Sequence, residues 1–174
     1  MGFVIREATL EGSEEIARIQ VDTWRTAYNG IVRQSFLDEM DYGVRGESWR
    51  TQLATGNSRI YVTETDGAIC GFVSGGRLRE PLSDFDGEIF AIYIGWRHSR
   101  RGCGRVMMRR LAKDLLQDGL KGVVVWVLER NLACGSYARL GGELVGRNVI
   151  TIGAADLVEV AYGWRDLRNL AEAE

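Results

Sequence analysis

An arginine- and glycine-rich segment past the middle of the chain has the residue types that bind phosphate. Residues 89–108 read IFAIYIGWRHSRRGCGRVMM, in which an apolar run ends at Ile94 and Gly102-Cys103-Gly104 opens a predicted helix. The free N–H groups and partial positive charge at a helix start favour an anion, and glycines let a ligand approach the backbone. Guanidinium groups that can reach phosphate oxygens stand at Arg100, Arg101 and Arg105. The segment therefore predicts an anion-binding loop.

Two common phosphate-binding loops do not match this segment. A Walker loop needs Gly-Lys-Ser/Thr, and the sequence contains no such run. A dinucleotide-binding fingerprint needs a third small residue, but Met107 stands at that position. A glycine turn with solvated arginines remains a purely structural interpretation, because a single Gly-x-Gly is weakly specific.

The spacing of apolar residues predicts the elements that hold this loop in place. Period-two patterns and apolar runs predict strands at residues 3–7, 59–65, 68–78, 88–94 and 123–128, and two more around the Gly153 turn within 143–165. Helical spacing predicts an early helix that includes Ile16 to Tyr28, and further helices at 35–53, 104–117 and 132–139. Asp66-Gly67 is typical of a tight hairpin turn. This order predicts an α/β fold with one mixed central sheet of about seven strands flanked by helices.

The composition excludes several classes of protein. The chain has 174 residues, 45% of them hydrophobic, and a formal net charge of -2 at pH 7, which fits one soluble domain over residues 1–174. The scattered cysteines argue against a disulfide framework or a metal site: Cys70, Cys103 and Cys134. The sequence has no signal-peptide pattern and no apolar run long enough to span a membrane. We therefore expect a cytoplasmic protein without a metal, membrane or nucleic-acid partner.

A second motif downstream narrows the interpretation of the loop. Residues 131–146 read NLACGSYARLGGELVG and are similar to the pattern N-x-x-A-x-x-F-Y-x-x-x-G-F, with Ser136 and Gly142 in place of its aromatics. Three residues correspond to its main residues, Asn131, Tyr137 and Gly141; Tyr137 and Gly141 keep its Y-x-x-x-G spacing, and Asn131 lies one position nearer to them than in the pattern. Residues 99–104 follow the pattern Q/R-x-x-G-x-G/A, except that Ser99 replaces its first residue. Together with the Trp24-Arg25-x-x-Tyr28-x-Gly30 segment, these motifs resemble the GNAT superfamily of N-acetyltransferases.

The resemblance implies a fold and a cosubstrate. In this superfamily the sheet splays between its fourth and fifth strands, here residues 88–94 and 123–128, and acetyl-CoA binds in the gap. The pantetheine arm then pairs with strand backbone that would otherwise lack hydrogen-bond partners. The cofactor-binding residues implied here are Ile92, Tyr93, Ile94, Arg100, Arg101, Gly102, Cys103, Gly104, Arg105, Asn131 and Tyr137.

The implied reaction moves the acetyl group to a primary amine by direct attack within a ternary complex. Glu88 is the candidate general base, because a carboxylate recurs in the family at the start of this strand. Strand alternation is expected to place Glu88 on the face of Phe90 and Ile92, and a partly apolar cleft suits a base. Asp84 and Asp86 are weaker candidates, and a carboxylate without a catalytic role is the alternative.

Tyr137 matches the family's general acid and is expected to protonate the CoA thiolate, with a packed helix tyrosine as the alternative. Backbone N–H groups near Ile92 or Tyr93 are the expected oxyanion donors. Trp24 and Tyr28 are candidate acceptor-binding residues, although aromatic residues on early helices are more often core.

Several alternatives stay open at this level. A pair between His98 and Cys103 lacks an orienting partner, so Cys103 is expected to offer its backbone N–H instead. A non-catalytic acyl-CoA-binding domain and a protein N-terminal or lysine acetyltransferase are alternative functions, as is a nucleic-acid-binding module that uses the basic loop. A small-molecule amine acceptor and a homodimer are the expectations that we carry forward.

Overall fold

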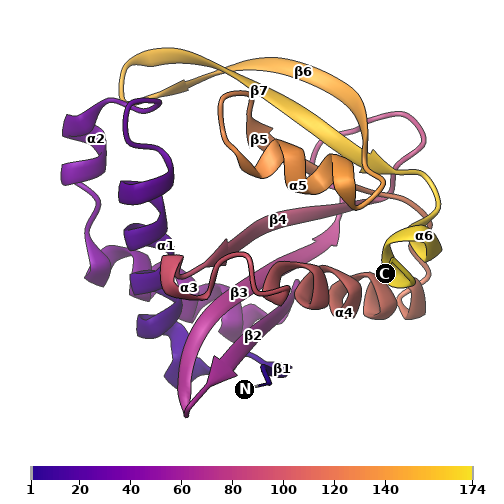
Figure 1. The fold of residues 1–174 in the computed structure, drawn as a ribbon, viewed down its shortest axis with the longest axis horizontal. Coiled ribbons are helices and arrows are strands. Elements are labelled where there is room, and N and C mark those ends of the chain that lie inside the picture. Colours follow the sequence, from indigo (N-terminus) through magenta and orange to yellow (C-terminus); the bar gives the residue numbers. More distant parts are fainter. Residues whose placement is uncertain (1, 174) are drawn as a thin grey trace.

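The computed structural model describes residues 2–173 and contains one seven-stranded sheet with the strand order β1-β2-β3-β4-β5-β7-β6. Neighbouring strands are antiparallel except for β4 and β5, which are parallel. This arrangement confirms the predicted mixed sheet (Figure 1). The strands are β1 Val4–Glu7, β2 Arg59–Thr65, β3 Ala68–Arg77, β4 Gly87–Ile94, β5 Val123–Leu128, β6 Glu143–Ile152 and β7 Ala155–Trp164.

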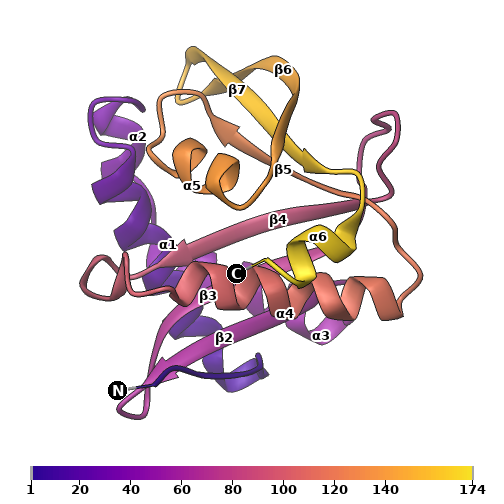
Figure 2. The ribbon, with the colours of Figure 1, turned by 45° about the vertical axis from the view of Figure 1, so that its right-hand side comes forward.

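Helices cover both faces of the sheet. On one face of the β2–β4 half, α4 and α6 surround an apolar cluster that includes Met107 and Leu111, and on the other face α1 and α3 enclose Phe72 and Trp49 (Figure 2). Within residues 2–173, no helix has both the length and the apolar character needed to cross a bilayer. The helices are α1 Ser13–Ala27, α2 Gln34–Asp38, α3 Tyr42–Thr55, α4 Cys103–Gln117, α5 Ala133–Arg139 and α6 Leu167–Ala171, with short 3-10 turns at Leu10–Gly12 and Trp96–His98.

The single helix predicted at residues 35–53 is wrong, because the chain forms α2 and α3 there instead. Met40 lies buried between the two helices, and the Asp41 side chain accepts a 2.8 Å hydrogen bond from the Val44 N–H. An aspartate that caps a helix start in this way begins a new helix rather than continuing the old one. The C-terminal helix α6 was also not predicted; its Leu167 and Leu170 are fully buried.

The sheet opens between β4 and β5. The two strands pair only where Gly87–Ile89 lies beside Val123–Val125, although β4 continues to Ile94 and β5 to Leu128. Figure 2 shows the strands starting together near the β3–β4 loop and separating along their length. The splay predicted between the fourth and fifth strands is therefore confirmed, and it leaves the β5-facing edge of β4 without a strand partner beyond Ile89.

A β-bulge in β4 decides which side chains face each side of the sheet. Ser74 pairs with Ala91 while the next residue of β3, Gly75, pairs with Ile89, so Phe90 is an extra residue on β4. As a result Ile89 and Ile92 both pack in the α4 cluster. Glu88, the neighbour of Ile89, points to the opposite face. The expectation that Glu88 shares a face with Ile92 is wrong, because the bulge shifts the alternation between them.

One end of the opening is closed by contacts between distant parts of the chain. Tyr28, Val32 and Leu37, from α1 to α2, pack in one cluster with Leu128 of β5 and with apolar residues of the β6–β7 hairpin. A Cβ built on Gly153, at the tip of that hairpin, would lie 2.7 Å from Phe36 Cβ, which shows how closely the two segments approach. Figure 1 shows α2 beside this turn. These contacts bridge the two halves of the splayed sheet.

Candidate active site

The predicted anion-binding loop forms the start of α4. Gly102 is the N-cap residue with φ of 84°, a left-handed conformation that glycine adopts without strain, and no side chain caps this helix. The first backbone bond of the helix runs from the Val106 N–H to the Gly102 carbonyl at 3.2 Å. The N–H groups of residues 103–105 precede that bond and have no acceptor within the helix. The loop therefore presents free donors and the positive end of a helix dipole.

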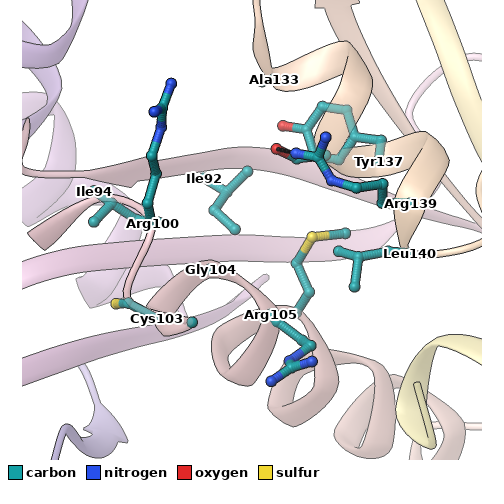
Figure 3. A pocket seen from close by; sticks show the side chains of 13 residues that line it. Ile92, Ile94, Arg100, Cys103, Gly104, Arg105, Ala133, Tyr137, Arg139 and Leu140 are labelled. Atoms are coloured by element: carbon teal, nitrogen blue, oxygen red, sulfur yellow. Dashed lines mark hydrogen bonds between the residues drawn. The ribbon is translucent and has the colours of Figure 1, made fainter. Parts of the chain in front are cut away.

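A cavity of about 660 Å³ opens over this helix start. Figure 3 shows β4 residues Ile92 and Ile94, α4 residues Gly104 and Arg105, and α5 residue Tyr137 around it. The predicted cofactor-binding residues that line it are Ile92, Ile94, Arg100, Gly102, Cys103, Gly104, Arg105 and Tyr137. Arg101, Tyr93 and Asn131 are not part of this lining.

One wall of the cavity comes from α5 and is not predicted by the sequence motifs. Arg139 lines it from α5, and its guanidinium donates a 3.3 Å hydrogen bond to Ser136 Oγ. The other unpredicted lining residues are Met108, Ala133, Ser136 and Leu140. Residues three and four apart share one face of a helix, so the spacing of Ala133, Tyr137 and Leu140 was an available signal. Only the position of α5 showed that this face looks at α4.

Tyr137 lies where this cavity meets a second, smaller one. The second cavity, of about 240 Å³, occupies the opening between β4 and β5, and Tyr137 lines both cavities. Burial raises the pKa of the Tyr137 phenol, so it keeps its proton at neutral pH. Its ring packs edge-on to the Trp164 ring.

The second cavity, which we name the interstrand cavity, contains three of the remaining predicted residues. Tyr28, Tyr93 and Asn131 all line it. The Tyr93 hydroxyl accepts a 2.9 Å hydrogen bond from Trp24 Nε1, and burial raises the pKa of Tyr93. Asn131 Oδ1 accepts a 2.9 Å hydrogen bond from the Ala133 N–H at the start of α5. Asn131 therefore holds a helix start while it borders the cavity.

Trp24 and Tyr28, the two candidate acceptor-binding residues, occupy different positions. Tyr28 borders the interstrand cavity, and burial raises the pKa of its phenol. Trp24 does not line that cavity. The centroid of its ring lies 4.6 Å from that of the Tyr28 ring and 6.1 Å from that of the Phe36 ring. Trp24 therefore supports Tyr28 and Tyr93 from behind.

Glu88 lies in a third cavity, of about 320 Å³, which we name the Glu88 cavity. The Glu88 side chain is only 5% exposed, and its carboxylate forms an ion pair with Arg79 from the β3–β4 loop. Trp126 lines both the Glu88 cavity and the interstrand cavity, so the two adjoin. The lining residues are Arg79, Glu80, Pro81, Leu82, Glu88, Trp126, Asn148 and Glu159.

The weaker carboxylate candidates have other partners. Asp86 accepts hydrogen bonds from the backbone N–H groups of Lys121 and Gly122, at 2.9 and 3.0 Å, and so holds the start of β5 beside β4. Asp84 sits in the β3–β4 loop, 3.7 Å from Arg165 in an exposed ion pair. Neither residue lines the Glu88 cavity. Of the three carboxylates considered, only Glu88 borders a cavity that adjoins the opening.

Cys103 and His98 do not form a dyad. The Cys103 sulfur lies 3.1 Å from Thr63 Oγ1 in the core, and burial raises the pKa of its thiol to about 11. A protonated, buried thiol is a poor nucleophile. Among the described residues, no group of three or more His, Cys, Asp or Glu is arranged to hold a metal ion.

Known protein families and relatives show to which family this chain belongs. Residues 15–142 match the model of the acetyltransferase (GNAT) family. The chain belongs to this family. It is also 34% identical over 167 residues to YuaI of Bacillus subtilis, described as an uncharacterized N-acetyltransferase, and the match covers 95% of each chain. The resemblance stated from the sequence motifs is confirmed, and the chain is an acetyl-CoA-dependent acyltransferase.

Solved structures show the same GNAT fold. PaiA N-acetyltransferase from Thermoplasma acidophilum, in complex with coenzyme A, superposes with a TM-score of 0.71 at 14% identity over 94% of this chain and 100% of that one. YncA from Salmonella typhimurium, with its cofactor acetyl-CoA, gives a TM-score of 0.71 at 18% identity over 96% and 95% of the two chains. At these identities the likeness establishes the fold.

Proposed function

We propose that this GNAT protein transfers the acetyl group of acetyl-CoA to a primary amine of a small molecule, by direct attack within a ternary complex. The observation that carries the proposal is the arrangement of three cavities. The cavity over the α4 start and the interstrand cavity share Tyr137, and the interstrand cavity adjoins the Glu88 cavity at Trp126. This order suits a donor that enters from one side and an acceptor that enters from the other.

The residues over α4 fit the phosphates of a CoA donor. The uncapped N–H groups of residues 103–105 suit an anion, and Arg100, Arg105 and Arg139 line the same cavity. A Cβ built on Gly104 would lie 3.0 Å from Ile94 Cδ1, so a side chain at this position would crowd the cavity wall. Beyond Ile89, the β4 backbone has donors and acceptors that β5 does not use, and these fit a pantetheine arm.

The chemistry divides between the two sides of the interstrand cavity. A typical amine has a pKa of about 10 and must lose a proton before it attacks the thioester carbonyl. Glu88 takes that proton, directly or through water. As the carbon–sulfur bond breaks, the Tyr137 phenol donates its proton to the departing sulfur, which leaves as a neutral thiol. Backbone N–H groups of β4 near the bulge stabilise the oxyanion of the intermediate.

The size of the Glu88 cavity supports a small acceptor. Its volume is about 320 Å³, which lies at the lower end of the range for small-molecule sites. Trp126 supplies an apolar wall, and Asn148 and Glu159 supply polar groups from β6 and β7. The homodimer and the cytoplasmic location expected from the sequence stay predictions.

Thermal unfolding in the presence of acetyl-CoA, CoA, ATP or NAD tests the donor side. A ligand that binds only the folded state at a hundred times its Kd adds about 2.7 kcal/mol of stability. We expect both CoA species to raise the melting temperature and ATP and NAD to leave it unchanged. Release of CoA thiol in the presence of primary amines then tests the transfer. An unchanged melting temperature at millimolar acetyl-CoA would contradict the proposal.

A further inference from the structure

The buried carboxylate of Glu88 depends on one residue for its hydrogen bonds. Arg79 donates three, from its backbone N–H and Nε to Oε2 at 3.2 and 3.1 Å, and from Nη2 to Oε1. The Arg79 side chain is 63% exposed, whereas that of Glu88 is 5% exposed. Arg79 therefore covers the carboxylate from the solvent side and provides both oxygens with a charged partner.

The acidic residues around Glu88 make its ion pair with Arg79 more important. Glu80 from the β3–β4 loop and Glu159 from β7 line the same cavity, while the contributions of β5 and β6, Trp126 and Asn148, are uncharged. Among the described residues that line this cavity, Arg79 is the only positively charged one. Burial raises the pKa of Glu159, and the negative charge of Glu88 adds to that effect. Without Arg79, the Glu88 carboxylate would face two acidic groups and no cation.

The position of the Arg79 guanidinium is itself fixed. It lies 4.7 Å from the centroid of the Phe90 ring, which makes it a cation–π contact, and Phe90 is the extra residue of the β4 bulge. Two adjacent guanidinium donors on one carboxylate also set the orientation of the carboxylate plane. The same bulge that turns Glu88 away from Ile92 thus provides the surface on which its partner rests.

We propose that Arg79 is a positioning residue that supplies the positive partner of the Glu88 carboxylate and holds it oriented toward the Glu88 cavity, the proposed acceptor site. The inference rests on the proposed function, in which Glu88 accepts the proton of the acceptor amine. A guanidinium beside a carboxylate favours its charged form, which is the form that a base needs. The competing interpretation is that the ion pair only fastens the β3–β4 loop to β4.

The variant Arg79→Gln tests the proposal, with Arg77→Gln as its matched control. Arg77 is an exposed arginine at the end of β3; it lies with Arg79 along a neighbouring cavity but does not contact Glu88. Carboxyl carbon NMR of the protein labelled at Glu Cδ, with the Glu88 signal assigned through Glu88→Gln, gives the titration midpoint directly. We expect the midpoint to rise by about one pH unit or more in Arg79→Gln and to stay unchanged in Arg77→Gln.

The pH–rate profile for CoA thiol release gives the functional counterpart. In Arg79→Gln the acidic limb of kcat/KM should move to higher pH by the same amount, and Arg79→Lys should restore part of the shift because it keeps the charge. An ion pair that only fastens the loop would change the melting temperature and the NMR midpoint while leaving the acidic limb of kcat/KM in place.

Different results would overturn the proposed acetyl transfer and the proposed role of Arg79. A wild-type protein that shows no acetyl transfer would overturn the proposed function, while the NMR titration would still report whether Arg79 controls the charge of Glu88. An Arg79→Gln protein that is folded and titrates at Glu88 like wild type would overturn the inference. If Arg79→Gln does not fold, Arg79→Met, which retains an apolar stem over Phe90, replaces it in the same measurement.

Discussion

The cavity over the α4 start, which is the proposed donor cavity, and the Glu88 cavity, which is the proposed acceptor side, are built in different ways. The donor side uses consecutive residues: a strand, a short turn and a helix start between Ile92 and Arg105, with one added wall from α5. The acceptor side combines four residues of the β3–β4 loop with one residue each from β4, β5, β6 and β7. The donor side relies on backbone groups, which many sequences can supply. The acceptor side relies on side chains, so specificity for the amine is expected to lie there.

The largest effect is expected from a substitution that closes the donor side at one backbone position. Gly104→Val should raise the Kd for CoA by more than about a hundredfold, roughly 2.7 kcal/mol, because the new side chain meets Ile94 and fills the space beside the helix start. Isothermal titration with CoA measures this change. The melting temperature without ligand is the control, and a well-folded variant with normal affinity would remove the loop from the donor site.

On the acceptor side, Glu88→Gln should lower kcat/KM by about a hundredfold and flatten the acidic limb of the pH–rate profile. CoA affinity should not change, since Glu88 does not line the donor cavity. Asp84→Asn is the matched control, because Asp84 lies in the same β3–β4 loop, pairs with Arg165 and does not line the Glu88 cavity. An acidic limb that persists in Glu88→Gln would place the base elsewhere.

Tyr137 lines both the donor cavity and the interstrand cavity, so a variant of this residue tests its proposed role as the general acid. Tyr137→Phe should lower kcat by about tenfold to a hundredfold and leave the Kd for CoA within about twofold of wild type, because only the phenolic proton is lost. Tyr162→Phe is the control. The centroid of the Tyr162 ring lies 6.0 Å from that of the Tyr137 ring, but Tyr162 does not line any of the three cavities described above. Equal turnover in both variants would remove the acid role from Tyr137.

The smallest expected effect concerns two adjacent arginines. Arg100→Ala should weaken CoA binding by about fivefold, whereas Arg101→Ala should change it by less than about twofold, because only Arg100 lines the donor cavity. The difference should shrink at higher ionic strength, since exposed charges are screened. Titrations at low and high salt check this. An equal loss in the two variants would show that overall loop charge, rather than position, attracts the donor.

Local sequence predicted most of the elements, because their signals span few residues. β2 and β5 match their predicted bounds, and the Asp66-Gly67 turn has positive φ at both residues, as a tight hairpin requires. The division into α2 and α3 was missed, although Asp41 is a capping residue type. Met40, the residue before it, is buried in a tertiary cluster that the local pattern does not show.

The amino-acid sequence alone predicts the order of the strands, the loop at the start of α4 and, through two motifs in the same order as in the family, the family itself. Those features follow from backbone conformation and from residues close in the chain. Only the tertiary structure decided that Arg139 joins the donor cavity, that the bulge at Phe90 separates Glu88 from Ile92, and that Arg79 is the partner of Glu88. These depend on how strands and helices pack, because a one-residue bulge reverses which side chains face α4 and which face the opposite side of the sheet.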